Sequence, residues 1–332
     1  MNGENLKKSL NSYFDDYDNI GVTVYAVLKT QDSSEPVKLD IEADALDGLK
    51  ELFMDSLRHT LLDKDEISIL NLSSSDERVD AVYVYDLELP TELTALEKVI
   101  TQDDLPLLNL NDEGLSSIKA LLIEIGNNVG QLVLYKTMAP INIYGRSSFF
   151  LKKSQSRLEK LSDEFLRVSA GFQMLRIDDS LLVIDLTTLE KSFGFHDVIK
   201  REAVSGISAI ENASLVENPD VLHELVEDVK YARKLTKVAK SSPVIKAGIP
   251  STTIVNFCKT FPRLAGRIRF NENEDKVLLD TKVSKDLFIN LLMDNYLTSE
   301  LTAYHYTSVA KDSVDDEEAN EPSSTDGNQA DE

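Results

Sequence analysis

The sequence predicts an α+β fold, with mixed sheets, hairpins and flanking helices in two subdomains followed by a disordered acidic tail. Helix-spaced apolar positions alternate with β-branched runs, and Gly/Asn and Asp/Ser turns join two pairs of apolar strands. The charge balance also changes near residue 145, and a length of 332 residues suits about two domains. The predicted divisions are 1–145, 146–310 and 311–332.

The first subdomain, 1–145, is predicted to mix helices and strands. Its helices have apolar residues at helical spacing, and its strands are β-branched or alternate in polarity. The loop from Gly126 to Gly130 can supply positive φ angles and therefore predicts a hairpin. The predicted elements are helices at 6–17 and 46–61 and strands at 22–28, 67–72, 79–87, 121–125 and 131–135.

Pro140 and Gly145 punctuate the chain where the second subdomain, 146–310, is predicted to begin. A second hairpin is expected through Asp178, Asp179 and Ser180, and its second strand, apolar on both faces, should be central in its sheet. Thr187 and Glu190 fit a helix-capping box at positions N-cap and N3. The other predicted elements are helices at 196–213, at 219–241, after Pro250 and at 283–295, with strands at 267–270, 276–279 and 301–309.

The last segment, 311–332, carries nine acids and one base. Its composition cannot bury enough apolar surface to offset the entropy lost on ordering, so disorder is predicted there.

Composition excludes several classes of protein. No uncharged stretch approaches the roughly 18 apolar residues of a membrane span, and the N-terminal residues lack the apolar core of a secretion signal. One cysteine permits no internal disulfide, and four scattered histidines do not suggest a zinc site. We therefore expect a cytoplasmic protein without a metal or cofactor.

The net charge of −23 is unevenly distributed along the chain. Residues 1–150 carry a net charge of −15, whereas residues 151–310 are neutral overall. The window 229–271 nevertheless contains ten bases and no acid, which gives it a net charge of +10. Because of this window, an acidic total does not exclude nucleic acid as a partner. The predicted nucleic-acid-binding residues are Lys230, Arg233, Lys234, Lys237, Lys240, Lys246, Lys259, Arg263, Arg267 and Arg269.

The first five of these bases fall within about 120° of arc on a helix, which predicts a basic stripe. Each base that neutralises a phosphate also releases counterions, so such a stripe favours a DNA backbone. Since no base-reading motif is present, binding should be largely independent of DNA sequence. Two alternatives remain open: the window meets acids of this chain or of another protein, or it is a solvated face.

Four residues allow a catalytic alternative, which competes with ordinary turn chemistry. Asp178, Asp179, Asp280 and Lys282 could form a metal-dependent nuclease site that activates water. However, Asp-Asp-Ser is common in turns, and an acid-x-Lys spacing arises often in a chain with 58 acids. No phosphate loop or nucleophile elbow is present. The sequence therefore predicts a protein that is not an enzyme.

Two stretches carry a family resemblance. They are FQMLRIDDSLLVIDLTTLEKSFGF at 172–195 and NYLTSELT at 295–302. Both resemble the KwaB family of the bacterial Kiwa anti-phage defence system, over roughly residues 150–308. The resemblance implies a cytoplasmic effector that binds DNA and works with a membrane-embedded partner, KwaA. It carries no catalytic motif onto particular residues of this chain.

The acidic first subdomain suggests how such a partner could be met. Cytoplasmic loops of membrane proteins are rich in Lys and Arg, which a net −15 surface could bind. The protein would then be recruited to the inner membrane by its partner without inserting into it. Because most soluble oligomers are symmetric dimers, a homodimer is also expected.

Overall fold

The computed structural model describes residues 1–29, 35–73, 78, 80–102, 104–111, 114–127, 130–138, 151–154, 157–160, 166–191 and 193–308. Its helices are α1 (Gly3–Asp15), α2 (Ala43–Leu57), α3 (Thr94–Thr101), α4 (Leu186–Lys191), α5 (Phe195–Asn212), α6 (Asp220–His223), α7 (Val229–Ser241), α8 (Pro243–Lys246), α9 (Ser251–Thr260) and α10 (Lys282–Leu292). Its strands are β1 (Gly21–Leu28), β2 (Pro36–Lys38), β3 (Ile69–Asn71), β4 (Val82–Val84), β5 (Ile118–Gly126), β6 (Gln131–Thr137), β7 (Leu151–Ser154), β8 (Arg157–Lys160), β9 (Met174–Ile177), β10 (Ser180–Val183), β11 (Arg269–Phe270), β12 (Val277–Leu278), β13 (Tyr296–Thr298) and β14 (His305–Thr307). This mixture of helices and sheets confirms the predicted α+β class.

One eight-stranded sheet organises the first part of the chain, in the order β2-β1-β5-β6-β9-β10-β4-β3. Neighbouring strands are antiparallel except β3 and β4. Both predicted hairpins are present, β5–β6 around Gly126 and β9–β10 around Asp178, which adopts a φ of 49°. The run β9–β10 lies inside the sheet, as expected for strands that are apolar on both faces.

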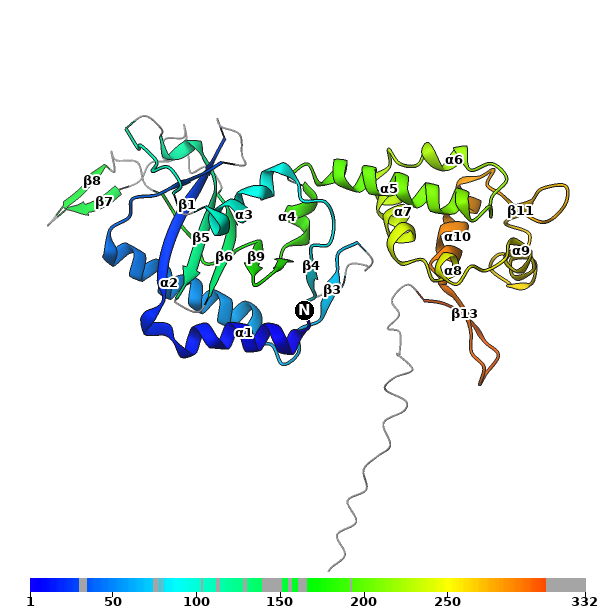
Figure 1. Ribbon diagram of the computed structural model, residues 1–332, viewed down its shortest axis with the longest axis horizontal. Coiled ribbons are helices and arrows are strands. Elements are labelled where there is room, and N and C mark those ends of the chain that lie inside the picture. Colours follow the sequence, from blue (N-terminus) through cyan, green and yellow to red (C-terminus); the bar gives the residue numbers. More distant parts are fainter. Residues whose placement is uncertain are drawn as a thin grey trace, which may run out of the picture.

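Helices cover both faces of this sheet (Figure 1). On one face, α1 and α2 bury Leu10 and Phe53 against the side chains of β1, β5 and β6. On the other face, α3, α4 and α5 pack against the alternate side chains of the same strands, among them Leu122 and Tyr135. We call residues 1–191, with this sheet and its helices, the sheet part.

The helices α5 to α10 and the small hairpins β11–β12 and β13–β14 form what we call the helical part, residues 193–308. Helix α5 runs from the sheet part into it (Figure 1). Its apolar residues belong to the same core as Tyr135 of β6 and Phe288 of α10, so one core joins the two parts. The arrangement therefore fixes the surface of α7 to α10 relative to the sheet.

Strands from both sides of the predicted 145/146 division pair directly, since β6 lies beside β9. The division itself stays a prediction. The predicted disordered tail, 311–332, lies outside the described residues, as do parts of the charged segment 149–168, within which β7 and β8 pair.

Three local predictions are wrong. The strand expected over 301–309 is limited to β14, because residues 301 and 302 form the turn of the β13–β14 hairpin. The helix expected over 219–241 is split into α6 and α7, because Asp228 adopts an extended conformation and its side chain accepts a 3.0 Å hydrogen bond from the amide of Lys230. The helix α4 begins before Thr187. Asp185 takes the capping role there, accepting 3.0 Å and 2.6 Å hydrogen bonds from the amide and hydroxyl of Thr188.

Candidate nucleic-acid interface

Helix α7 presents the first five predicted binding residues. Asp228 starts the helix, and Tyr231, Leu235 and Val238 bury its apolar side against the core. Its closest neighbour is α5, where Gly206 lets the backbone of Leu235 approach. Because α7 packs against α5, α4 and α10, most of the stripe does not face open solvent.

Five of the ten predicted binding residues are paired with carboxylates of this chain. Arg233 pairs with Glu190 of α4, and Lys234 Nζ lies 2.5 Å from Asp286 Oδ1 of α10. The other three pairs are Lys240 with Glu202 at 3.2 Å, Lys259 with Glu274 at 2.5 Å, and Arg269 with Asp280 at 2.9 Å. All five acids lie outside the window and are brought to it by folding, so half of its ten positive charges are compensated in three dimensions.

Lys237 differs from the rest of the stripe. Only 8% of its surface is exposed, which leaves little of the side chain for a ligand to reach. The structure therefore does not bring all ten bases together on one face.

Four predicted residues remain exposed without an acidic partner in the described parts of the chain. We call them the unpaired bases: Lys230, Lys246, Arg263 and Arg267. They lie at the start of α7, at the end of α8 and in the turn after α9. All four belong to the helical part, and their charges are available to a ligand.

One further cation was missed as a binding residue because it lies outside the basic window. Lys282 opens α10, and its Nζ lies 5.9 Å from the ring centroid of Tyr231 of α7. No spacing rule joins 231 to 282, so only the packing of α10 against α7 reveals this proximity.

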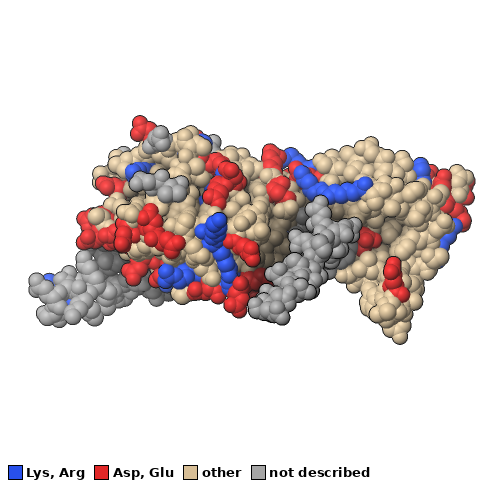
Figure 2. All heavy atoms as spheres, turned by 60° about the horizontal axis from the view of Figure 1, so that its bottom comes forward, with Lys and Arg blue, Asp and Glu red and all other residues tan. Residues whose placement is uncertain are grey.

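The charged surface agrees with this residue list. On the face seen in Figure 2, acids crowd over the sheet part, whereas the helical part is mostly uncharged, with a few bases and with acids at its outer edge and on its lower projection. The two parts therefore differ in charge at the surface as the sequence blocks predict, but that face shows no continuous basic patch.

The four residues of the nuclease alternative are not assembled. Asp178 lies in the β9–β10 turn of the sheet part, where its carboxylate accepts a 2.9 Å hydrogen bond from Ser9 of α1. Asp280 lies in the helical part and pairs with Arg269. Among the residues that the structure describes, no group of three or more His, Cys, Asp or Glu could hold a metal ion.

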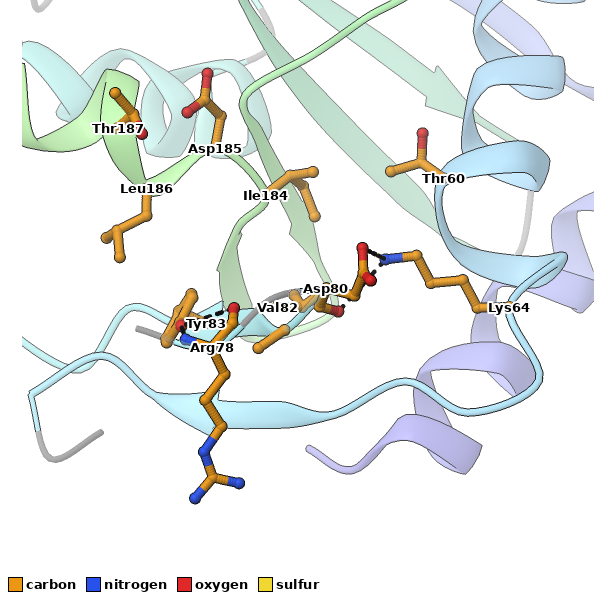
Figure 3. Close-up of a pocket in the computed structure, with 11 residues that line it drawn as sticks. Thr60, Lys64, Arg78, Asp80, Val82, Tyr83, Ile184, Asp185, Leu186 and Thr187 are labelled. Atoms are coloured by element: carbon orange, nitrogen blue, oxygen red, sulfur yellow. Dashed lines mark hydrogen bonds and ion pairs between the residues drawn. The ribbon is translucent and has the colours of Figure 1, made fainter. Parts of the chain in front are cut away.

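A polar cavity of about 320 Å³ opens beside β4 and the β10–α4 turn. Lys64 reaches toward Asp80 across it, with a 3.8 Å ion pair, while Arg78 turns its guanidinium away from the other lining residues (Figure 3). Asp185 is engaged as the cap of α4. The charged groups that line the cavity therefore make contacts within the chain, and the geometry of the cavity indicates no catalytic or binding role.

The histidines and the cysteine have ordinary structural surroundings. His59 Nδ1 lies 2.6 Å from Asp63, and His223 lies 3.4 Å from Glu211, both at the surface. Cys258 is fully buried, and burial raises the pKa of its thiol to about 12, so it is a packing residue.

Within the described ranges, no helix has the length and apolar character needed to cross a bilayer. The model of the family described as Kiwa protein KwaB-like matches residues 115–302, from just before β5 to the β13–β14 turn. The match begins earlier than the resemblance read from 150–308, and it includes the central strands β5 and β6.

A curated relative extends this similarity over nearly the whole chain. Kiwa protein KwaB from Escherichia coli O55:H7 (strain RM12579 / EPEC) is 29% identical over 325 residues, which are 95% of this chain and 100% of that protein. No solved structure gives a significant match. Since the family model covers more than half of the residues, the chain belongs to the KwaB-like family of the Kiwa anti-phage defence system.

Proposed function

We propose that this protein is a DNA-binding component of a Kiwa defence system, which binds with little sequence preference and interferes by occupying DNA. The observation that supports the proposal is the set of four unpaired bases on a helical part that the family model covers almost completely. Phosphate contacts of this kind supply most of the affinity of sequence-tolerant binding.

The paired bases contribute less to this proposal than the unpaired ones. A phosphate that approaches Lys259 or Arg269 must displace Glu274 or Asp280, and the released carboxylate then repels it. The unpaired bases need no such exchange. The number of effective phosphate contacts should therefore be nearer to four than to ten.

The test is a titration of the full chain with labelled duplexes of two unrelated sequences, from about 50 to about 200 mM salt, in EDTA and then in Mg²⁺. We expect equal affinity for both duplexes, a steep loss of affinity with salt, and intact DNA in Mg²⁺. Absence of binding at the lowest salt would contradict the proposal and favour an acidic protein as the partner of the helical part. DNA loss confined to Mg²⁺ would instead favour the nuclease alternative.

We also propose that the sheet part contacts a membrane-embedded, KwaA-like partner. Four acids are exposed along one face of α2, at positions 44, 47, 51 and 55. Partial burial and the carboxylates of Glu51, Asp55 and Asp47 raise the pKa of Tyr17 beside them, so their charges act together on one surface. Such a row suits the Lys- and Arg-rich cytoplasmic loops of a membrane protein.

Neutralising this row tests the second proposal. Asp44→Asn, Asp47→Asn, Glu51→Gln and Asp55→Asn together are expected to reduce co-purification with the tagged membrane partner at low salt, because long-range attraction is lost. The matched control neutralises four exposed acids of the helical part, at Asp197, Asp220, Glu272 and Glu300. Equal losses in both variants would contradict a specific contact through α2.

A homodimer stays a prediction. A molar mass of twice 37.1 kDa, measured by light scattering, would support it.

A further inference from the structure

The β13–β14 hairpin projects from the helical part (Figure 1). Its strands pair in the register Tyr296 with Thr307 and Thr298 with His305. Every residue from 300 to 307 is exposed. The tip carries Leu301, 94% exposed, and Tyr304 at 68%, while Tyr306 of β14, paired with Leu297, is 49% exposed. A two-stranded hairpin in water is marginally stable, so its root must be held by other contacts.

Aromatic packing holds this root. The Phe261 ring lies 5.3 Å from Tyr296 and 5.0 Å from His305, centroid to centroid, and Phe261 and Tyr296 are both buried. The amide of Ser308 also donates a 2.9 Å hydrogen bond to the carbonyl of Asn295. The hairpin is thus fixed at its base, while the tyrosine and leucine side chains of the tip are left available to a ligand.

One of the unpaired bases, Arg263, acts on the root, and a second, Arg267, follows it four residues later. Arg263 and Arg267 follow Phe261 in the same turn, and both are exposed. Burial raises the pKa of Tyr296 to about 12, and the Arg263 guanidinium opposes that rise, which places its charge close to the base of the hairpin. Glu300, the acid of the hairpin, lies near the tip and repels a phosphate backbone. The backbone is therefore attracted to the root and not to the tip.

Cations beside exposed aromatic rings are the combination that binds single-stranded nucleic acid. Base–aromatic stacking contributes about 1–3 kcal/mol per base, while nearby cations follow the backbone. In a duplex the faces of the bases are covered by their neighbours, so a projecting tyrosine finds a stacking partner only at unpaired bases. An apolar protein surface would use the tip, but it would leave Arg263 and Arg267 without a role.

We propose that the β13–β14 hairpin binds unpaired DNA bases, with Tyr304 and Tyr306 stacking on them and Arg263 and Arg267 contacting the adjoining phosphates. This inference rests on the proposed DNA binding and specifies its substrate as DNA with single-stranded regions. The protein then binds duplex DNA through four side chains alone, Lys230, Lys246, Arg263 and Arg267. It binds single-stranded DNA through these four cations and the hairpin.

The test uses the full chain with a single-stranded oligonucleotide containing 2-aminopurine and with the corresponding duplex. Wild type is expected to quench the 2-aminopurine fluorescence. The Tyr304→Ala/Tyr306→Ala variant is expected to lose the quenching and at least about tenfold in single-strand affinity, with duplex affinity unchanged. Tyr304→Phe/Tyr306→Phe should restore both signals, since phenylalanine keeps the stacking ring. Tyr17→Ala, at an exposed tyrosine of the sheet part, is the control.

The outcomes separate this inference from the function on which it rests. If the double alanine variant quenches and binds single strands like wild type, or loses single-strand and duplex affinity equally, the hairpin does not stack on bases and the inference is wrong. In both cases DNA binding itself stands. If wild type binds neither DNA at low salt, the proposed function fails first and the hairpin serves a protein surface.

Discussion

Gly206→Ala is expected to lower the melting temperature of the full chain by roughly 4 °C, through a loss of about 3 kcal/mol in the free energy of unfolding. A Cβ at this position would lie 2.1 Å from the carbonyl oxygen of Leu235 and 2.8 Å from its carbonyl carbon. These atoms are backbone and cannot turn aside as a side chain would. Helices α5 and α7 must therefore separate, and Ile207 and Leu235, both fully buried, lose packing contacts.

Gly48→Ala is the matched control, because it makes the same change inside a helix without the contact. No atom lies within 4 Å of a Cβ at Gly48, in the middle of α2. Alanine there should raise stability by about 0.5–1 kcal/mol, since it restricts the unfolded chain and favours the helix. Thermal unfolding followed by circular dichroism measures both variants. A Gly206→Ala protein that melts at or above wild type would contradict the close approach of α5 and α7.

The features of the fold that depend on residues close together in the sequence could be predicted. Both hairpins of the large sheet could be predicted, because a Gly/Asn or Asp/Ser turn between two apolar runs specifies its own geometry within a few residues. Apolar spacing likewise predicted α1, α2 and α5. The sequence did not show where the hairpins would go. That β9 joins β6 and β10 joins β4 is decided by contacts between distant segments.

Predicted helix boundaries were wrong where one capping side chain decided the start of a helix against the pattern of apolar and polar residues. The apolar and basic spacing continues through 219–241, yet α6 ends at His223 and Asp228 starts a separate helix by capping α7. At α4, Asp185 and Thr187 are both acceptable caps by residue type. Propensity does not separate them, and the structure selects Asp185, whose carboxylate binds Thr188.

The candidate interface was predictable only in part, for an electrostatic reason. A charge count along the chain sees no acid between 229 and 271, but folding adds acids from other elements. Glu190 is 43 residues from Arg233, and Asp286 is 52 residues from Lys234. Charge counted in a window therefore differs from charge at a surface, because folding brings in acids such as Glu190 as well as cations such as Lys282. The exposure of Tyr304 and Tyr306 was equally hidden, since an alternating strand does not reveal that no element covers it.

Replacing the four unpaired bases, Lys230, Lys246, Arg263 and Arg267, with glutamine is expected to weaken duplex DNA binding on the order of 10²- to 10³-fold near physiological salt. Each lost phosphate contact lowers the slope of log affinity against log salt by about 0.9, so the slope should fall by about 3.6. Because the four side chains are exposed, the melting temperature should change little. Anisotropy titrations at several salt concentrations measure both quantities.

The control changes the same charge at four bases that are paired: Lys200, Lys240, Lys259 and Arg269 to glutamine. Both variants carry four fewer positive charges, so an effect of net charge alone would weaken DNA binding equally. The four paired bases are compensated by Glu227, Glu202, Glu274 and Asp280. If this compensation matters, the control should lose less than about tenfold in duplex affinity and keep most of the slope of log affinity against log salt. Equal losses would show that these ion pairs open for DNA and that paired bases take part as well as the unpaired ones. A larger loss in the control would contradict the assignment of the unpaired bases. The comparison thus measures whether charge counted along the sequence or charge left free by the fold determines binding.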